Sequence, residues 1–168
     1  DGARHLENAV DASRRVPGVT DADRADLWTR IGSLSELAGM FEASVDAYRR
    51  AERLLREDPL GCAKVLELRA TVHTRTGELT TATRAVGRAR RLLEGVDGGG
   101  QTTVVRLDGL TARIRVEQER LGDAMHWAER AAAGARATHD PERLVLALVF
   151  LDTVEIYMGV PGLGARHL

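Results

Sequence analysis

A pair of apolar or small positions, three residues apart, recurs along the chain at nearly constant intervals. The pairs are Leu6/Ala9, Tyr48/Ala51, Val86/Ala89 and Ala128/Ala131. The first positions of successive pairs, continued to Leu168, are separated by 42, 38, 42 and 40 residues. The five residues that begin at Gly2 also occur, in the same order, at residues 164–168. This regularity predicts an internal repeat of roughly 40 residues that runs through about four periods.

Each period divides into two segments of helical character. The first segments are predicted at 21–38, 59–76, 103–118 and 141–158, and the second at 41–57, 79–94 and 121–138, after a leading segment at 2–15. No segment shows the alternation of a half-buried strand. The apolar run at 144–151 fits a buried strand by periodicity alone, but the Asp-Pro start before it and its place in the repeat favour a helix. The predicted class is all-α.

Signals for helix starts and ends agree with this division. Asp58-Pro59 and Asp140-Pro141 each place a capping carboxylate before a proline at the first helical position. Thr20 and Asp23 have the spacing of a capping box. Glycines that favour a left-handed C-cap follow the predicted helices at positions 39, 77, 95 and 159.

The residues of the first complete period resemble the tetratricopeptide repeat. The resemblance rests on Trp28, Ile31, Gly32, Gly39, Phe41, Ser44, Tyr48 and Ala51. It implies a right-handed solenoid of antiparallel helix pairs, with first helices on the concave side and second helices on the convex side. The period exceeds the 34 residues usual in that family, so the helices are expected to be longer. Long arrays of this kind resemble those of large bacterial signalling ATPases, cyclases and transcriptional regulators.

We therefore expect residues 1–168 to form a single repeat domain cut from a longer array. The expected units are 1–18 (partial), 20–57, 58–95, 101–138 and 140–168 (partial). A helix pair cannot bury its apolar face alone, so stacked pairs share a continuous core. A truncated array exposes an apolar end, and we expect self-association through the terminal repeats.

Composition and charge further restrict the classes of function expected for the chain. The chain has 24 basic and 25 acidic residues and one cysteine. This balance argues against a nucleic-acid binder, although arginines cluster at 84–91 and 113–120. No apolar stretch is long enough for a membrane span. With no signal-peptide pattern at its start, the chain is expected to be cytoplasmic.

The residues that could carry chemistry do not form a catalytic or metal-binding pattern. The five histidines lack the HExxH spacing, and His126 with Glu129 would need two more ligands to hold a metal. The glycine-rich turn at 95–100 lacks a preceding strand and a following GK[ST]. We expect neither an enzyme nor a bound metal or cofactor.

In the tetratricopeptide family, ligands lie along first-helix positions that face the concave groove. Carried onto this sequence, the expected partner-binding residues are Thr29, Ser33, Glu36, Lys64, Glu67, Thr71, Arg75, Arg106, Arg113, Glu117, Thr153 and Tyr157. Arg75, Arg106 and Arg113 have the chemistry to pair with a partner's carboxylates. The expected function is a scaffold that binds a protein, a peptide or a neighbouring domain of the same chain. The alternative is an effector-sensing domain of a bacterial transcriptional regulator, with a small molecule in the concave cavity.

Overall fold

The computed structural model describes residues 8, 10, 12, 16–96 and 100–159. In this part of the chain the helices are α2 (Asp21–Leu37), α3 (Phe41–Leu54), α4 (Pro59–Arg75), α5 (Leu79–Leu93), α6 (Gln101–Glu117), α7 (Leu121–Ala137) and α8 (Pro141–Tyr157). None of these described residues lies in a β-strand. The all-α prediction is confirmed, and the apolar run 144–151 lies inside α8. The predicted segment 2–15 falls mostly outside the described residues.

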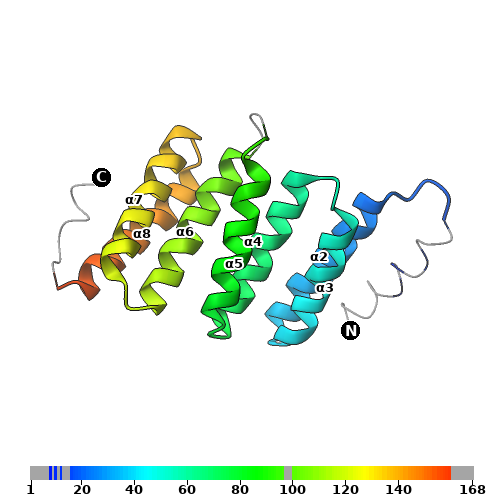
Figure 1. Ribbon diagram of the computed structural model, residues 1–168, viewed down its shortest axis with the longest axis horizontal. Coiled ribbons are helices and arrows are strands. Elements are labelled where there is room, and N and C mark those ends of the chain that lie inside the picture. Colours follow the sequence, from blue (N-terminus) through cyan, green and yellow to red (C-terminus); the bar gives the residue numbers. More distant parts are fainter. Residues whose placement is uncertain (1–7, 9, 11, 13–15, 97–99, 160–168) are drawn as a thin grey trace. The chain divides into compact units, whose positions relative to one another are not determined.

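The chain divides into two compact units, Asp1–Glu94 and Gly95–Leu168. In the first unit, α2 packs on α3, α3 on α4, and α4 on α5. In the second, α6 packs on α7 and α7 on α8. The helices of each pair run antiparallel because only a short turn connects them (Figure 1). Consecutive helices therefore pack as pairs within each unit, while a single array over residues 1–168 stays a prediction.

The helix starts are capped as the sequence predicts. The backbone N–H of Asp23 donates to Thr20 Oγ1 at 3.1 Å, and the Asp23 carboxylate accepts from the Thr20 N–H at 2.8 Å. Asp58 accepts from the Gly61 N–H at 2.9 Å, and Asp140 from the Arg143 N–H at 3.0 Å. Each cap satisfies a backbone donor that the first helical turn leaves without a partner.

The turns after the first helices share one backbone conformation but not one residue type. Gly39, Gly77 and Gly159 have φ of 74°, 78° and 73°, the left-handed region. After α6 the same conformation is held by Glu119, with φ of 59°. The prediction that Gly95 forms a left-handed cap is wrong: α5 ends at Leu93, and Gly95 is not among the residues with positive φ. The α5–α6 connection is longer and does not require the tight turn.

Close approach of paired helices explains the small residues in the core. A Cβ placed on Gly32 would lie 2.5 Å from Cε1 of Tyr48, so the Tyr48 ring occupies the space that a side chain would need. The second unit has the same relation between Gly134 and Val105, at 2.6 Å. Its core is built largely from alanines, namely Ala112, Ala128, Ala131, Ala132 and Ala147, together with Leu151.

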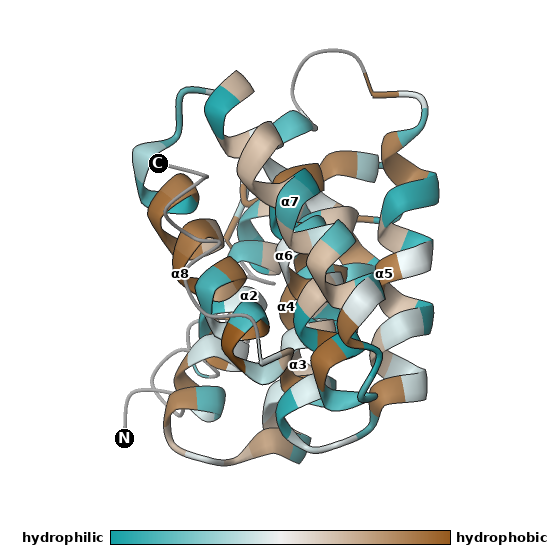
Figure 2. Ribbon diagram, turned by 90° about the vertical axis from the view of Figure 1, so that its left-hand side faces the viewer, coloured by the Kyte–Doolittle hydropathy of each residue, from teal (hydrophilic) through white to brown (hydrophobic). Residues whose placement is uncertain are grey.

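Helix α8 buries one face and exposes an apolar face. Leu151 and Val154 are fully buried within the second unit. Val145, Val149 and Ile156 are 59%, 61% and 59% exposed. Most of α8 is accordingly brown in Figure 2. The second unit thus leaves an apolar face uncovered among the described residues.

Candidate interaction face

The expected binding residues of the first unit lie on two helices. Thr29, Ser33 and Glu36 are three or four residues apart on α2, so they share one face of that helix. Lys64, Glu67, Thr71 and Arg75 have the same spacing on α4. These seven residues define what we call the first-helix face.

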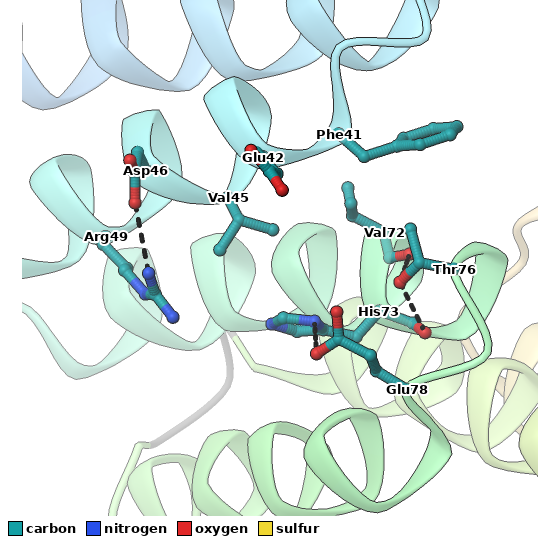
Figure 3. Close-up of a pocket in the computed structure, with 9 residues that line it drawn as sticks. All are labelled: Phe41, Glu42, Val45, Asp46, Arg49, Val72, His73, Thr76 and Glu78. Carbon is teal, nitrogen blue, oxygen red and sulfur yellow. Dashed lines mark hydrogen bonds and ion pairs between the residues drawn. The ribbon is translucent and has the colours of Figure 1, made fainter.

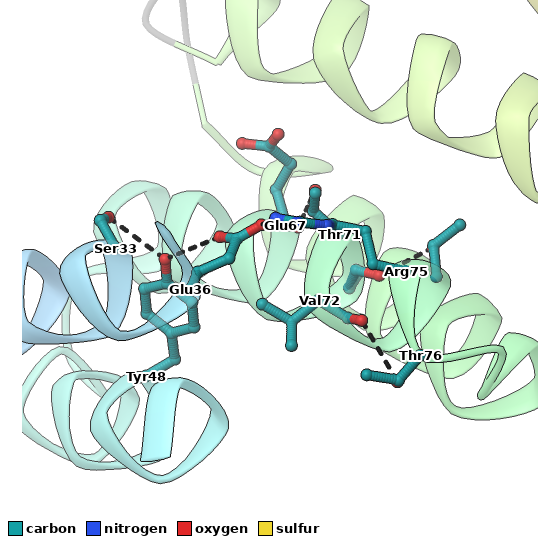
Figure 4. Close-up of polar contacts among 10 residues, drawn as sticks. Ser33, Glu36, Tyr48, Glu67, Thr71, Val72, Arg75 and Thr76 are labelled. Carbon is teal, nitrogen blue, oxygen red and sulfur yellow. Dashed lines mark hydrogen bonds and ion pairs between the residues drawn. The ribbon is translucent and has the colours of Figure 1, made fainter. Parts of the chain in front are cut away.

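The Tyr48 hydroxyl links α3 to two of these residues. It lies 3.2 Å from the Ser33 hydroxyl and donates to the Glu36 carboxylate at 3.5 Å (Figure 4). The Tyr48 side chain is completely buried, and burial raises the pKa of its phenol. Because the phenol stays protonated, it remains a hydrogen-bond donor to Glu36. The contact fixes the Glu36 side chain, which is only 15% exposed.

Glu36 in turn holds Arg75. Nη1 of Arg75 donates to Oε1 of Glu36 at 2.8 Å, joining α2 to α4. The Arg75 guanidinium also lies 5.1 Å from the centre of the Phe41 ring, within the range of a cation–π interaction. Its side chain remains 40% exposed. Arg75 is thus oriented by two partners while part of its guanidinium faces solvent.

The other residues of the first-helix face are placed less tightly. The Thr29 hydroxyl donates to the Ala25 carbonyl at 2.8 Å, and the Thr71 hydroxyl donates to the Glu67 carbonyl at 3.1 Å. Such bonds to the preceding turn occupy the donor of each hydroxyl but leave its oxygen able to accept. Glu67 is 7% exposed, whereas Lys64 is exposed.

The second unit holds the remaining expected residues. Arg106 and Arg113 are seven residues apart on α6 and therefore share a face, with Arg113 the more exposed. Glu117 and Tyr157 line one open hollow of about 520 Å³, although they come from different helices. Thr153 donates to the Val149 carbonyl at 2.8 Å on α8. The structure thus brings Glu117 and Tyr157 together.

The sequence pattern indicates no functional role for one buried histidine of the first unit. His73 near the end of α4 is 4% exposed and lines a cleft of about 310 Å³ with Glu78. Burial lowers the pKa of its imidazole, and the charge of Glu78 opposes that effect only in part. Periodicity could have placed His73 in the core, but the cleft depends on how α3 meets α4.

A second feature that the sequence pattern does not predict is an ion-pair cluster around a buried carboxylate. Arg69 and Arg88 both form ion pairs with the Glu52 carboxylate, which is 8% exposed. The cluster connects α3, α4 and α5. It also engages Arg88, one of the arginines whose clustering on α5 raised the question of nucleic-acid contacts. Close by, burial raises the pKa of the Cys62 thiol, so its place near the α4 start does not favour a thiolate.

The described part of the chain holds neither a cluster of metal ligands nor a membrane-spanning helix. Among the described residues, no three His, Cys, Asp or Glu side chains converge as metal ligands would. No helix in the same ranges has both the length and the apolar content required to cross a bilayer.

The fold defines an all-α protein whose helices pack as consecutive antiparallel pairs. It is similar to the crystal structure of BtubC (BKLC) from P. vanneervenii, with a TM-score of 0.80 and 15% sequence identity. The match covers 97% of this chain and 67% of that chain. At this identity the similarity describes the fold alone. No protein-family model matches the chain, and no curated protein matches its sequence.

Proposed function

We propose that the chain is part of a tetratricopeptide-like array with a long period. The first helices of successive pairs begin at Asp21, Pro59, Gln101 and Pro141, close to the spacing of the sequence repeat. The Tyr48 ring seated on Gly32 is the kind of large-on-small contact that the family resemblance implies. We infer a right-handed solenoid in which the first-helix face lines the concave side.

In this proposal the chain catalyses no reaction and acts as an interaction module of a larger bacterial regulator in the cytoplasm. The observation that carries it is the chain of contacts from Ser33 and Tyr48 through Glu36 to Arg75. Fixed side chains lose little conformational entropy when a partner binds. A polar face held in place across two successive helices is therefore suited to an extended peptide or a helix of another domain.

The proposal is tested by charge reversal at the positions expected to carry it. The wild-type chain and the double variant Arg75→Glu with Arg113→Glu are each immobilised and exposed to lysate of the source bacterium. The captured proteins are then quantified by mass spectrometry. A partner that binds along the expected groove residues should be lost at least about tenfold from the double variant, because each glutamate repels the partner's carboxylates that an arginine would attract. Arg56→Glu reverses an 81% exposed arginine away from this face and should not affect capture. Equal capture by all three chains, with unchanged helicity and melting temperature, contradicts the proposal.

Effector sensing is a second candidate, supported by the hollow between Glu117 and Tyr157. Its volume of about 520 Å³ lies within the range of small-molecule sites. If this hollow binds an effector, at least one metabolite in a thermal-shift screen should raise the melting temperature of the wild type but not that of Tyr157→Ala. No stabilisation by any metabolite favours the scaffold.

A further inference from the structure

The cleft beside His73 has the geometry of a small binding site. It lies where α3 meets the end of α4 and the turn that leads into α5 (Figure 3). Its volume of about 310 Å³ is at the lower end of the range for ligand sites. The lining residues are Phe41, Glu42, Val45, Asp46, Arg49, Val72, His73, Thr76 and Glu78.

The inner part of the cleft is apolar. Val72 is fully buried, Val45 is 9% exposed, and Phe41 is partly buried against the same core. Such surfaces favour methylene groups over water, and each buried methylene contributes favourably to binding. A ligand that fits here has a short aliphatic part.

The rim of the cleft is acidic. Glu42, Asp46 and Glu78 contribute three carboxylates, whereas Arg49 is the one arginine or lysine among the lining residues. Arg49 already pairs with Asp46 at 3.1 Å. Glu42 has no ion-pair partner among the described residues and lies across the cleft from Glu78 (Figure 3). The lining therefore favours a cation and disfavours an anion.

The wall of the cleft also holds a buried nitrogen without a hydrogen bond. Nδ1 of His73 lies 3.0 Å from Oε2 of Glu78 without the geometry of a hydrogen bond. Because the imidazole is buried and its pKa is lowered, the ring is neutral at pH 7 and adds no positive charge to the cleft. An N–H group of a ligand can donate to the Glu78 carboxylate beside this nitrogen.

A more open hollow of about 580 Å³ continues from the cleft. It shares Phe41, Glu42, Thr76 and Glu78 with the cleft and extends along the turn that precedes α3. The carboxylates of Glu42 and Glu78 thus lie where the cleft meets the hollow. An occupant of the cleft has room to continue beyond it, as a side chain does when it belongs to a peptide.

We propose that this cleft binds an organic cation, an ammonium or guanidinium group on a short aliphatic stem. The stem lies against Val45 and Val72, and the charged group lies between Glu42 and Glu78. Lysine and arginine side chains divide their contacts in this way, with the stem on apolar surface and the head among polar groups. The cation is either the basic side chain of a peptide or a free amine.

Titrations monitored by two-dimensional NMR of the full chain distinguish these sources. The probes are agmatine, a free amine that also carries a guanidinium group, and the capped peptide acetyl-Ala-Arg-Ala-amide. Saturable shifts of the Glu42, Val45 and Glu78 amides with the peptide support a side-chain ligand, and such shifts with agmatine alone support a free amine. The same peptide with neutral citrulline in place of arginine should produce no saturable shifts.

Variants of the cleft connect the binding to its carboxylates. Glu42→Gln keeps the shape of the side chain and should weaken binding at least about threefold, the size expected for one exposed charge pair. Adding Glu78→Gln should abolish saturation. Glu57→Gln removes a carboxylate that is 91% exposed and does not line the cleft, and it should leave affinity unchanged. The inference is overturned if neither probe saturates up to about 10 mM, far weaker than ordinary specific binding, if citrulline binds equally, or if Glu42→Gln binds like the wild type.

Discussion

Tyr48 has two structural roles that constrain each other. Its ring fills the space over Gly32, and its hydroxyl reaches Ser33 and Glu36. A phenylalanine would keep the first contact and lose the second. Because Glu36 also holds Arg75, the position of one buried ring determines where an exposed guanidinium lies. The interior of the first pair is therefore coupled to the face proposed to bind a partner.

We predict that Gly32→Ala destabilises the chain by about 1–3 kcal/mol, the usual penalty for overpacking a core. The added methyl group would overlap the Tyr48 ring, which is buried and cannot move away freely. Urea unfolding measures the loss. Gly87→Ala on α5 is the matched control, because its methyl group meets its nearest neighbour, Arg91, at an ordinary 3.8 Å. That control should gain about 0.5–1 kcal/mol from helix propensity, and equal losses in both variants would contradict the account.

The lowered pKa of the buried His73 imidazole predicts a loss of stability in mild acid. The unfolded imidazole takes up a proton below its ordinary pKa of 6.5, whereas the buried one has a lowered pKa and resists protonation. Protons therefore favour the unfolded chain as the pH falls below 6.5, by up to about 1.4 kcal/mol per pH unit.

Urea unfolding at pH 8 and at pH 5.5 measures this effect. His73→Gln should remove most of the difference between the two conditions, while His126→Gln, at an exposed position, should retain it. An unchanged pH dependence in His73→Gln would show that other groups cause it.

At the residue scale, the sequence predicts burial, because burial follows helical periodicity. It does not predict contacts between helices, because these depend on where the helices meet. The burial of Trp28 and Tyr48 follows from helical spacing, and both are buried. The Glu36–Arg75 pair joins residues on different helix pairs, and the sequence does not contain their separation in space. The cleft at His73 likewise exists only because α3 meets α4 at a particular place.

At the scale of helices, the turns show how one conformation is reached by different residues. Glycine adopts positive φ without steric penalty, as at Gly77. Glu119 adopts it with a side chain, as does His139 after α7. A non-glycine residue in this region is strained by about 1–2 kcal/mol. The chain tolerates this strain where the adjoining helices are held by packing.

We predict that Glu119→Gly stabilises the second unit by about 0.5–1 kcal/mol. Relief of the backbone strain exceeds the extra entropy that glycine gives the unfolded chain. The reverse change at an equivalent turn, Gly77→Ala, should destabilise by about 1–2 kcal/mol. Differential scanning calorimetry measures both. A lower melting temperature for Glu119→Gly would mean that the Glu119 side chain contributes more than its backbone loses.

The sequence predicts the starts of α2, α4 and α8 correctly because their signals are local. Asp58, Asp140 and Thr20 cap the helices that follow them, since a cap needs only residues two or three positions away. The sequence misassigns Gly95 for the complementary reason. Glycine is compatible with many conformations, and only the tightness of the connection decides which one it adopts.

At the scale of the molecule, the exposed face of α8 has counterparts that are covered. Pro59 and Pro141 begin α4 and α8, so Ala63 and Val145 occupy the same place in the two helices. Ala63 is fully buried, and Val145 is 59% exposed. Helix α5 packs on α4, whereas the described residues include no helix after α8. This face is the structural basis for expecting self-association.

We predict that the chain associates at about 0.1 mM, a concentration at which exposed apolar surface promotes assembly. Light scattering should give a mass above that of the monomer. Val149→Lys with Ile156→Lys should restore the monomer, because both residues lie on the exposed apolar face. Leu37→Lys changes an 82% exposed leucine in the other unit and should not alter the mass. A monomeric wild type contradicts the prediction.

The two tryptophans give the molecule an internal set of optical reporters. Trp28 belongs to the first unit with Arg50 4.4 Å from its ring centre, and Trp127 belongs to the second with Arg130 at 4.6 Å. The sequence contains no other tryptophan. When either one is replaced by phenylalanine, the tryptophan emission of the chain therefore comes from a single unit. Fluorescence can then follow the melting of each half separately, without any attached dye.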